Sequence, residues 1–560
     1  MGGPAAGGVL AARALREAGA RTIFALPGGH IMPLFAGARA EGLALVTTRH
    51  EENAALMAEG WALATGEVGV VALTAGPGLA NALPGIAEAN AAGVPVVVIA
   101  GRTGLAQRGR GAVQDFDQLG AVAAMTKWRA ECLDTGRIPA YVAEAVHRAR
   151  AGAPGVAYLE IPQDVFAASA PEPEPAWPTG HEAEPARSVP ARDALTRAAR
   201  ALAGARRPVA LAGSGAFFSG AGPALRAFAE LTGIPVTTTS AARGLLDDDH
   251  PRCAGGLVHG GVALASADVA LVLGSAFNAN TLYGGPPLFP PGQTIIQVDV
   301  RPEHLGGLRR PEIALAGDVA ATLEALTEAW PGEPDAFGGW ADETRQAAAA
   351  SLSTWDAQCE RPANGIHPGW LAREVARFAD GLGPGTFVSD GGDSVVWGLA
   401  FSRAHRPGTN LFIGSAMGTL GVGLPFAIAA KAARPDEPVF LFTGDGAFGM
   451  SAMELDTAAR GRLGIVVVVV NNGGWGDVHE HAHPGAGRAE TAAASAMRYD
   501  LLAEAAGGRG ERVTAHDEVH GALERAAAAA AEGRPAVIDA VCDPDARSDL
   551  MASLGGLGVM

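Results

Sequence analysis

The chain has 560 residues, of which 48% are hydrophobic and 18% charged, so we expect several globular domains rather than a disordered chain. Its formal net charge of -17 argues against a nucleic-acid partner, because phosphate contacts need clustered lysine and arginine. No apolar run approaches the roughly 20 residues of a membrane span, and the amino terminus lacks the apolar core of a signal peptide. We therefore expect a cytoplasmic protein without a membrane partner.

The four cysteines lie far apart and form no CxxC pair, which predicts neither a disulfide framework nor a zinc site. They are Cys132, Cys253, Cys359 and Cys542.

Two stretches rich in proline and acidic residues, 168–190 and 329–340, are predicted to be linkers without packed elements. They divide the chain into three expected domains, 1–167, 191–328 and 341–545, followed by a tail, 546–560. This tail could be a lid that closes on a substrate or a frayed terminus.

In each segment, short runs of valine, isoleucine and alanine alternate with longer helical patterns. Examples are VGVVALTAG (68–76), PVVVIAG (95–101), PVALAGSG (208–215), PVFLFTGDG (438–446) and IVVVVVNN (465–472). Fully apolar strands separated by helices are typical of parallel sheets covered on both faces. We therefore predict an α/β protein with three doubly wound parallel-sheet domains.

Polar residues follow two of the predicted strands in the third segment. Asp445 stands between Gly444 and Gly446, and Asn471 and Asn472 end the next strand. Ligands of such sheets bind beyond the carboxyl ends of strands, and Mg²⁺ prefers oxygen ligands together with phosphate oxygens. The alternative is that Asp445 caps a helix and the asparagines form an ordinary turn.

Taken together, these two strand ends resemble the metal-diphosphate motif of thiamin diphosphate enzymes. The resemblance implies that Asp445, the side chain of Asn472 and the carbonyl of Gly474 hold Mg²⁺. It also assigns a cofactor-binding role to a group of neighbouring residues, namely Gly444, Gly446, Ala447 and Trp475.

The stretch 47–90, TTRHEENAALMAEGWALATGEVGVVALTAGPGLANALPGIAEAN, resembles the pyrimidine-binding domain of the acetolactate synthase-like superfamily. The resemblance makes Glu51 the carboxylate that bonds to the ring nitrogen N1′ of the cofactor and promotes its deprotonation. On its own, a glutamate here would be expected to begin a surface helix. In this superfamily two subunits build one site, so a homodimer is the expected minimum and a homotetramer the expected assembly.

The segment GSAMGTLGVGLP, 414–425, resembles the part that bends the cofactor. Leu420 would support the two rings from below, and the carbonyl of Gly418 would accept a hydrogen bond from the 4′-amino group. Core packing is the alternative role for Leu420.

His30 and Gln114 stand where benzaldehyde lyase, a member of the superfamily, has an active-site histidine and glutamine. An imidazole can move a hydroxyl proton, and an amide can hold a carbonyl oxygen. The alternatives are a helix-cap histidine and a solvated loop amide.

The stretch 274–306 resembles the oxalyl-CoA decarboxylase and 2-hydroxyacyl-CoA lyase branch, whose central domain binds an ADP moiety. This resemblance makes FAD unexpected and an ADP or CoA moiety a candidate ligand. Arg309 and Arg310 could contact CoA phosphates or form a solvated basic turn. The G-x-G of LAGSGAFFSG, 211–220, lacks the rest of a dinucleotide pattern.

After Trp475 come Asp477, the histidines His479, His481 and His483, and Glu490, our further acid/base candidate. We interpret the histidines as loop residues and not as metal ligands.

The leading hypothesis is a thiamin diphosphate-dependent carbon–carbon lyase that converts a 2-hydroxyacyl-CoA into formyl-CoA and a ketone or aldehyde, reversibly. The alternatives are a benzaldehyde lyase or acetolactate synthase-type carboligase acting on free 2-hydroxy ketones or 2-oxo acids, and a non-catalytic protein that keeps the fold.

Overall fold

The computed structural model describes residues 4–171, 186–413, 417–476 and 497–556, and these form two compact units. Unit 1 comprises Met1–Ala186 together with Met417–Ala433 and Met453–Gly461. Unit 2 comprises Arg187–Ala416, Arg434–Ala452 and Arg462–Met560. The domain boundaries expected from the linkers stay predictions.

Unit 1 contains a parallel sheet with the strand order β3-β2-β4-β5-β7-β6. The strands are β2 (Thr22–Ala25), β3 (Ala44–Thr47), β4 (Gly69–Leu73), β5 (Val96–Arg102), β6 (Trp128–Glu131) and β7 (Val156–Pro162). A short antiparallel pair, β1 (Ala5–Ala6) and β8 (Ser169–Ala170), joins the two ends of this segment.

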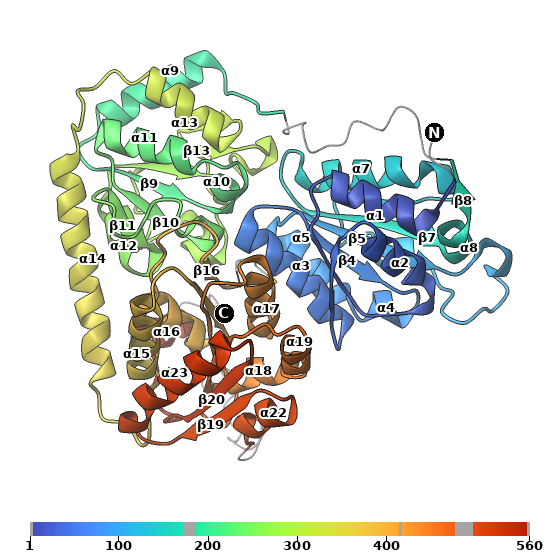
Figure 1. The fold of residues 1–560 in the computed structure, drawn as a ribbon. Helices are drawn as coiled ribbons and strands as arrows, with labels where there is room; N and C mark the ends of the chain where they lie inside the picture. The colour runs from blue at the N-terminus through green and yellow to red at the C-terminus, as the bar shows by residue number, and fades with distance from the viewer. Residues whose placement is uncertain (1–3, 172–185, 414–416, 477–496, 557–560) are drawn as a thin grey trace. The chain divides into compact units, whose positions relative to one another are not determined.

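Helices cover both faces of this sheet (Figure 1). One face packs against α1 (Gly7–Glu17), α2 (Met32–Ala40), α7 (Ile138–Arg150) and α8 (Gln163–Ala167). The other face carries α3 (Glu51–Thr65) and α5 (Leu83–Ala92), and α17 (Gly423–Ala433) packs on α3. Shorter helices are α4 (Pro77–Ala80), α6 (Gln118–Ala121), α19 (Glu454–Arg460) and the 3₁₀ turn η1 (Gly29–Ile31).

The first sheet of unit 2 has the order β11-β10-β9-β12-β13-β14 and is also parallel. Its strands are β9 (Pro208–Ala212), β10 (Val236–Thr238), β11 (Cys253–Gly256), β12 (Val269–Leu273), β13 (Thr294–Asp299) and β14 (Ile313–Ala316). The helices are α9 (Arg192–Ala203), α10 (Ser214–Phe218), α11 (Gly222–Thr232), α12 (Leu257–Ser266) and α13 (Val319–Glu328), with α12 on the face opposite α9, α11 and α13.

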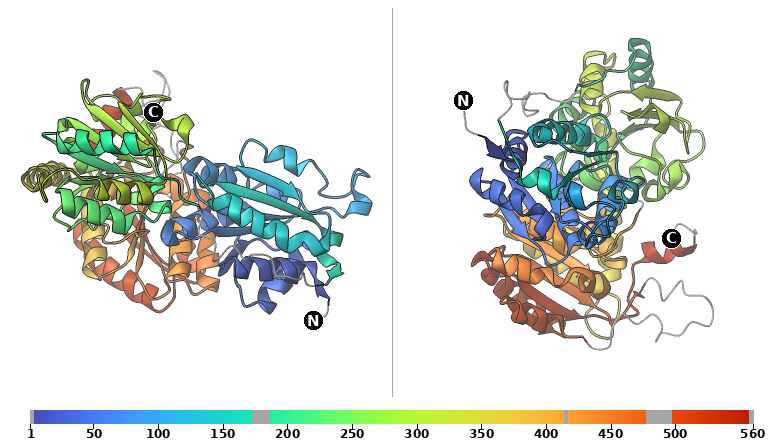
Figure 2. Two further views of the ribbon diagram at one scale, coloured as in Figure 1. Left: turned by 90° about the horizontal axis from the view of Figure 1, so that it is seen from above. Right: turned by 90° about the vertical axis from the view of Figure 1, so that its right-hand side faces the viewer.

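The second sheet of unit 2 has the order β16-β15-β17-β18-β20-β19. Its strands are β15 (Thr386–Asp390), β16 (Asn410–Leu411), β17 (Val439–Gly444), β18 (Val466–Asn471), β19 (Arg509–Val513) and β20 (Ala536–Val541). Its helices are α15 (Pro368–Gly381), α16 (Asp393–Phe401), α18 (Asp445–Ser451), α22 (Tyr499–Ala505), α23 (His516–Ala531) and α24 (Asp549–Gly556). The long helix α14 (Gly338–Cys359) contacts α12 and α15 and so spans both sheets of this unit (Figures 1 and 2).

The central strands are apolar because both of their faces are covered. All five residues of β4 and the first five of β18, Val466–Val470, are buried valine, leucine, alanine or glycine. The predicted α/β class with three parallel-sheet domains is confirmed, with six strands in each main sheet.

One expectation about the connecting segments differs from the structure. The predicted linker 329–340 ends inside a packed element, because Phe337 is buried in the core and α14 begins at Gly338. The tail contains α24, whose first residue Asp549 pairs with Arg361 at 2.7 Å. Within the described ranges, no helix combines the length and apolarity needed to cross a bilayer.

Candidate active site

Three neighbouring strands of unit 2 end in glycines and polar side chains. β15, β17 and β18 are adjacent and parallel, so their carboxyl ends meet at one edge of the sheet. These ends carry the segments 390–393 (DGGD), 444–446 (GDG) and 471–474 (NNGG). Ligands of open parallel sheets bind at this edge.

Asp445 is a buried carboxylate at this edge, with 2% of its surface exposed. Its Oδ1 accepts a hydrogen bond from the Gly446 N–H at 2.8 Å, and its Oδ2 accepts one from the Gly473 N–H at 2.9 Å. Burial raises the pKa of Asp445 to about 6, although the backbone N–H groups act in the opposite direction. Burial and backbone N–H groups are the largest causes of this shift, and no basic side chain is among them, so the carboxylate suits a bound cation.

The two asparagines at the end of β18 have different environments. Asn471 is buried, and its Nδ2 donates to Asp539 Oδ1 at 2.8 Å and to the Met497 carbonyl at 3.2 Å. Asn472 is half-buried, and within the described parts of the chain its Oδ1 accepts a single longer bond, 3.3 Å, from the Gly474 N–H. Asn472 is therefore the better placed of the two to offer an oxygen to a ligand.

Gly446 has a packing role that our sequence analysis did not foresee. A Cβ added there would lie 2.7 Å from Cζ3 of Trp475, so the indole ring lies against the first turn of α18. Ala447, the next residue, is buried. Gly444 has more room, because its Cβ would meet the Ser394 hydroxyl at 3.2 Å. Trp475 thus holds the segment after β18 close to Asp445.

The end of β15 is a third polar strand end that our sequence analysis did not single out. Asp390 is 1% exposed, and its Oδ1 accepts the Gly391 N–H at 2.7 Å. Gly391 has a φ of 102°, which a residue with a side chain rarely adopts. Asp393 accepts hydrogen bonds from the indole of Trp397 at 2.7 Å and from the Ser548 N–H at 3.1 Å. The signal that could have found this strand end resembles that of Asp445: an acid at the end of a buried strand, followed directly by glycine.

In unit 1, Glu51 is the first residue of α3 and follows β3, as the motif predicts. It is 6% exposed, so it is not a surface residue. Its Oε2 accepts a hydrogen bond from Asn81 Nδ2 at 3.0 Å. A Cβ on Gly78 would lie 3.7 Å from its Oε1, which places the glycine-rich turn after β4 beside the carboxylate.

The backbone before Glu51 is held by Glu454, a residue that sequence reasoning missed. Glu454 is fully buried, and its carboxylate accepts the N–H groups of Arg49 at 3.0 Å and His50 at 3.1 Å. It also accepts Asn53 Nδ2 at 2.9 Å. Burial raises the pKa of Glu454, while its hydrogen bonds act in the opposite direction. This residue lies 403 positions from Glu51, and no local pattern links the two.

His30 lies in η1, directly after β2, at the carboxyl edge of the unit 1 sheet. Its Nδ1 lies 3.2 Å from the Thr74 hydroxyl, and Thr74 follows β4 in the same way. Gly101 lets His30 approach β5 closely, because a Cβ there would lie 2.5 Å from His30 Cβ and 2.9 Å from the His30 carbonyl. Burial lowers the pKa of His30, so its imidazole is neutral at neutral pH.

Gln114 is packed and not simply a solvated loop amide. It is half-buried with a φ of 67°, a strained conformation for a residue other than glycine. A Cβ on Gly76 would lie 2.6 Å from Gln114 Cβ, so the two backbones approach closely. Strain of this kind often marks functional positions.

Gln118 fixes the loop that carries Gln114. It is fully buried; its Oε1 accepts the Gly76 N–H at 3.1 Å, and its Nε2 donates to the Gly101 carbonyl at 3.2 Å and Tyr158 hydroxyl at 3.0 Å. We did not predict this residue. It ties the loop to the ends of β4 and β5.

Gly418 and Leu420 lie in the segment that precedes α17. Gly418 is exposed with a φ of 67°, and a Cβ there would meet nothing within 4 Å. Leu420 is half-buried, in contrast to Leu424 of α17, which is 1% exposed. The side chain of Leu420 is therefore not fully buried in the hydrophobic core.

The two arginines proposed for CoA lie among the described residues, and the further loop candidates do not. Arg309 is half-buried and donates from Nη1 to the Gly284 carbonyl at 3.2 Å, whereas Arg310 is exposed. Glu490, Asp477 and the three loop histidines lie outside the described residues.

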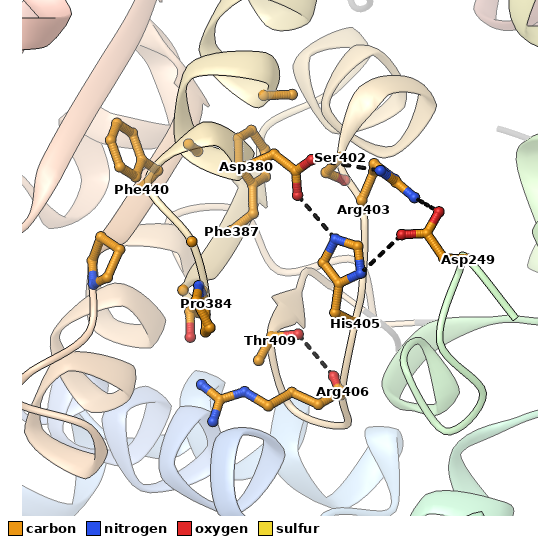
Figure 3. Close-up of a pocket in the computed structure, with 16 residues that line it drawn as sticks. Asp249, Asp380, Pro384, Phe387, Ser402, Arg403, His405, Arg406, Thr409 and Phe440 are labelled. Atoms are coloured by element: carbon orange, nitrogen blue, oxygen red, sulfur yellow. Dashed lines mark hydrogen bonds and ion pairs between the residues drawn. The ribbon is translucent and has the colours of Figure 1, made fainter.

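A pocket of about 500 Å³ lies at the opposite end of the second unit 2 sheet, where β15 and β17 begin. Figure 3 shows Phe387 and Phe440 on one side of it and Asp380, Arg403 and His405 on the other. This pocket is separate from the edge that carries Asp445, and none of our candidate residues lines it.

Comparison with known proteins identifies the family. Three family models match the chain: the N-terminal TPP binding domain of thiamine pyrophosphate enzymes over residues 6–121, the central domain over 195–326 and the C-terminal TPP binding domain over 390–540. A "probable acetolactate synthase" of Mycobacterium bovis is 36% identical over 540 residues, with 96% of both chains covered. A "2-hydroxyacyl-CoA lyase" of Oryza sativa subsp. japonica is 31% identical over 563 residues, covering 97% of this chain and 96% of the relative. The chain belongs to the thiamine pyrophosphate enzymes.

This family membership confirms the predicted superfamily and an enzyme of carbon–carbon bond chemistry, and supports thiamin diphosphate as the cofactor. The residues fit such a cofactor. In unit 2, the buried carboxylate of Asp445 and glycine-rich strand ends suit a metal and a diphosphate. In unit 1, a buried glutamate lies beside the glycine-rich turn after β4.

Proposed function

We propose that this thiamine pyrophosphate enzyme is a 2-hydroxyacyl-CoA lyase that splits its substrate reversibly into formyl-CoA and a ketone or an aldehyde. The observation that carries the proposal is the imidazole of His30, which is neutral at neutral pH. It lies at the carboxyl edge of the unit 1 sheet, and Glu51 follows strand β3 at the same edge. Cleavage beside a hydroxyl group needs a base for the hydroxyl proton, whereas release of carbon dioxide from a 2-oxo acid does not.

The cofactor set of the proposal is thiamin diphosphate with Mg²⁺. When bound, thiamin diphosphate supplies a carbon nucleophile that can hold the electrons of the broken bond. Glu51 would exchange a proton with the ring nitrogen N1′, and Gly418 and Leu420 would hold the rings. Asp445, the Asn472 amide and the Gly474 carbonyl would hold Mg²⁺, and their oxygen chemistry suits that ion.

His30 would remove the proton of the substrate hydroxyl. Thr74 binds Nδ1, and within the described residues Nε2 makes no hydrogen bond, so that nitrogen can serve the substrate. Gln114 would orient the carbonyl oxygen through its amide. We also keep Glu490 as a second acid/base group.

For the CoA part of the substrate, Arg309 and Arg310 would contact phosphates, and an ADP moiety would bind in the central domain. Arg310 is the more available of the two, since Arg309 already donates to Gly284. The name 2-hydroxyacyl-CoA lyase borne by the rice relative, which is similar over nearly its whole length, supports a thioester substrate. We propose a homodimer as the smallest active assembly, with a homotetramer as the expected form.

The alternative is an acetolactate synthase-type carboligase or a benzaldehyde lyase acting on free 2-oxo acids or 2-hydroxy ketones. The 36% identity to a probable acetolactate synthase favours the first of these.

The test is a substrate panel. The enzyme would be incubated with Mg²⁺, thiamin diphosphate and 2-hydroxyacyl-CoA esters of several chain lengths, and formyl-CoA would be measured by mass spectrometry. Pyruvate and benzoin would be assayed in parallel. We expect formyl-CoA from at least one ester. Turnover of pyruvate or benzoin without turnover of any ester would overturn the proposal in favour of the alternative.

Two variants sharpen this test. Glu51→Gln removes the carboxylate and is expected to abolish every reaction in the panel, whereas Glu52→Gln changes its half-buried neighbour and is expected to preserve them. His30→Ala removes the base and is expected to lower lyase turnover by about 10² to 10⁴-fold.

A further inference from the structure

Two buried glutamates in unit 1 have no part in the chemistry described above. Glu59 lies on α3 and Glu88 on α5, and each is 1% exposed. Gly85 lets the two helices meet, because a Cβ there would lie 2.8 Å from the Glu52 carbonyl and 2.9 Å from Ala55 Cβ. About one turn further along each helix, α5 carries Glu88 and α3 carries Glu59 (helices α3 and α5 in Figure 1).

The two carboxyl groups are electrostatically coupled. Burial raises the pKa of Glu59 well above its usual value, and the charge of Glu88 raises it further. Of the elements packed against α3 and α5, strands β2 and β4 carry no ionisable side chain, whereas α17 carries Lys431, β5 carries Arg102, and β7 carries Tyr158 and Glu160. Burial and the charge of Glu88 are the two causes of the raised pKa of Glu59. The charge that acts on Glu59 therefore comes from Glu88.

Each carboxyl group also has an unsatisfied oxygen. Within the described residues, Glu59 Oε2 and Glu88 Oε1 are buried and have no hydrogen-bond partner. Two ionised carboxylates in such a place would repel each other and lose their hydration. One proton between them removes one charge and provides a donor for an oxygen that lacks one.

The remaining Glu88 oxygen points to the candidate site. Glu88 Oε2 accepts the backbone N–H of Thr419 at 3.2 Å. Thr419 stands between Gly418 and Leu420, the residues assigned to the cofactor rings. Gly418 itself has a φ of 67°, and a Cβ there would meet nothing within 4 Å.

We propose that Glu59 and Glu88 share a single proton and, as a singly charged pair, hold the segment 417–422 in place through the N–H of Thr419. Both glutamates are then positioning residues. The link to Gly418 and Leu420 rests on the proposed function, whereas the shared proton rests on the geometry of unit 1 alone.

The proposal has a definite pH dependence. The raised pKa of Glu59 means that the folded protein keeps a proton that the unfolded chain loses near pH 4.5. The stability contributed by this proton is fully present below pH 4.5 and is lost as the pH rises through the raised pKa. Once the proton leaves, repulsion between two carboxylates should displace Thr419 and weaken cofactor binding.

The first experiment uses the cofactor-free protein. Infrared difference spectra should show the carbonyl stretch of a protonated carboxyl group at neutral pH, and Glu59→Gln should remove it, while the matched control Glu52→Gln should keep it. Glu59→Gln should also flatten the pH dependence of the thermal unfolding temperature. The proposal of a shared proton would be overturned if the infrared band were unchanged in Glu59→Gln. It would also be overturned if the unfolding temperature of this variant changed with pH in the same way as that of the wild type.

The second experiment titrates thiamin diphosphate with Mg²⁺ into each protein and follows tryptophan fluorescence across pH. Glu59→Gln should bind with near wild-type affinity at neutral pH, because its amide can donate to Glu88, and should lose less affinity at alkaline pH. Glu88→Gln keeps an acceptor for Thr419 and should bind well, whereas Glu88→Ala should bind at least about tenfold more weakly, or about 1.4 kcal/mol.

If Glu59 served only to pack the two helices, the affinity of Glu59→Gln for the cofactor would change with pH as it does in the wild type. That result would contradict the proposal. Wild-type affinity in Glu88→Ala would contradict it as well. If Glu88→Ala does not fold, the near-isosteric Glu59→Gln still decides. Neither experiment uses a lyase substrate, so failure of the proposed 2-hydroxyacyl-CoA reaction leaves both results interpretable.

Discussion

The side-chain amide of Asn53 donates a hydrogen bond to the carboxylate of Glu454 at 2.9 Å, and the same carboxylate accepts the backbone N–H groups of Arg49 and His50. A residue from the later part of the chain thus fixes the turn that begins α3. Since Glu51 is the first residue of that helix, its position depends on Glu454.

Glu454→Ala should therefore both destabilise the protein and weaken its cofactor binding. It leaves the buried amide of Asn53 and the part-buried N–H groups of Arg49 and His50 without this acceptor, and a buried donor left in that state costs about 1 to 3 kcal/mol. The expected loss in the free energy of unfolding is at least about 2 kcal/mol, measured by denaturant titration, with reduced affinity for thiamin diphosphate.

Asp456→Ala is the matched control, because Asp456 lies on the same helix and forms a partly exposed pair with Arg460 at 2.8 Å. Its removal should cost no more than about 1 kcal/mol. Equal losses in the two variants would show that Glu454 has no special role.

Gly76→Ala should disturb the loop that carries Gln114. The new methyl group would lie 2.6 Å from Gln114 Cβ, and the φ of 66° with a ψ of -121° is a backbone conformation that strains any residue other than glycine. We expect reduced stability and a loss of turnover in whichever reaction the substrate panel identifies.

Gly109→Ala separates the effect of the steric clash from the effect of the backbone strain. Gly109 has a φ of 70° but nothing within 4 Å of an added Cβ, so this variant tests strain without a clash. If both variants lose the same stability and the same activity, the contact between Gly76 and Gln114 has no importance.

Local sequence patterns were enough to predict the three parallel sheets and the ends of β17 and β18, because apolar strands followed by glycines and oxygen ligands are contiguous in the chain. They also placed Glu51 after a strand. Glu454 and Gln118 could not be found in this way, since each acts through hydrogen bonds to residues far away in sequence. The packing of Trp475 on Gly446 was missed for the same reason: a glycine after a strand suggests a ligand, and the sequence does not show which ring lies against it.

Gly446→Ala should weaken binding of Mg²⁺ and thiamin diphosphate. The methyl group would lie 2.7 Å from Cζ3 of Trp475, so the ring and the adjoining segment 472–475 must move away from Asp445. We expect the affinity, measured by fluorescence titration, to fall by about tenfold or more. The control is Gly449→Ala, on the same helix with nothing within 4 Å, which should bind normally and be as stable as the wild type or slightly more so. Normal affinity in Gly446→Ala would show that the Trp475 contact does not support the metal site.

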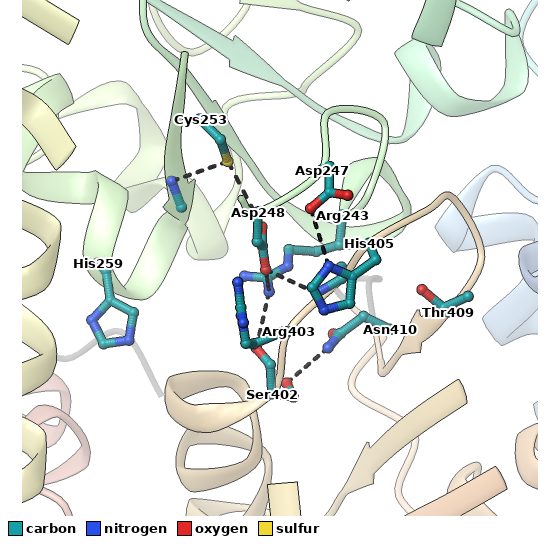
Figure 4. Close-up of polar contacts among 12 residues, drawn as sticks. Arg243, Asp247, Asp248, Cys253, His259, Ser402, Arg403, His405, Thr409 and Asn410 are labelled. Carbon is teal, nitrogen blue, oxygen red and sulfur yellow. Dashed lines mark hydrogen bonds and ion pairs between the residues drawn. The ribbon is translucent and has the colours of Figure 1, made fainter. Parts of the chain in front are cut away.

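His405 should make the stability of unit 2 depend on pH. Its Nε2 lies 2.9 Å from Asp380 and its Nδ1 lies 3.1 Å from Asp247, with Asp249 at 3.7 Å (Figures 3 and 4). Arg403 pairs with Asp249 in the same cluster. Burial by itself lowers the pKa of His405, but the bonds to Asp380 and Asp247 outweigh burial, and the pKa is raised above 6.5.

Because the folded protein holds this proton more tightly than the unfolded chain, the stabilisation is fully present below pH 6.5 and is lost as the pH rises through the raised pKa. His405→Gln should therefore lower the thermal unfolding temperature at about pH 6 and have little effect at about pH 9, with a contribution within about 1 kcal/mol because the cluster is partly exposed. Asp380→Asn by itself should also lower the unfolding temperature at about pH 6 and have little effect at about pH 9. Combined with His405→Gln, it should lower the unfolding temperature little further, because the two side chains act together. A difference between wild type and His405→Gln that stays constant across this pH range would refute the assignment.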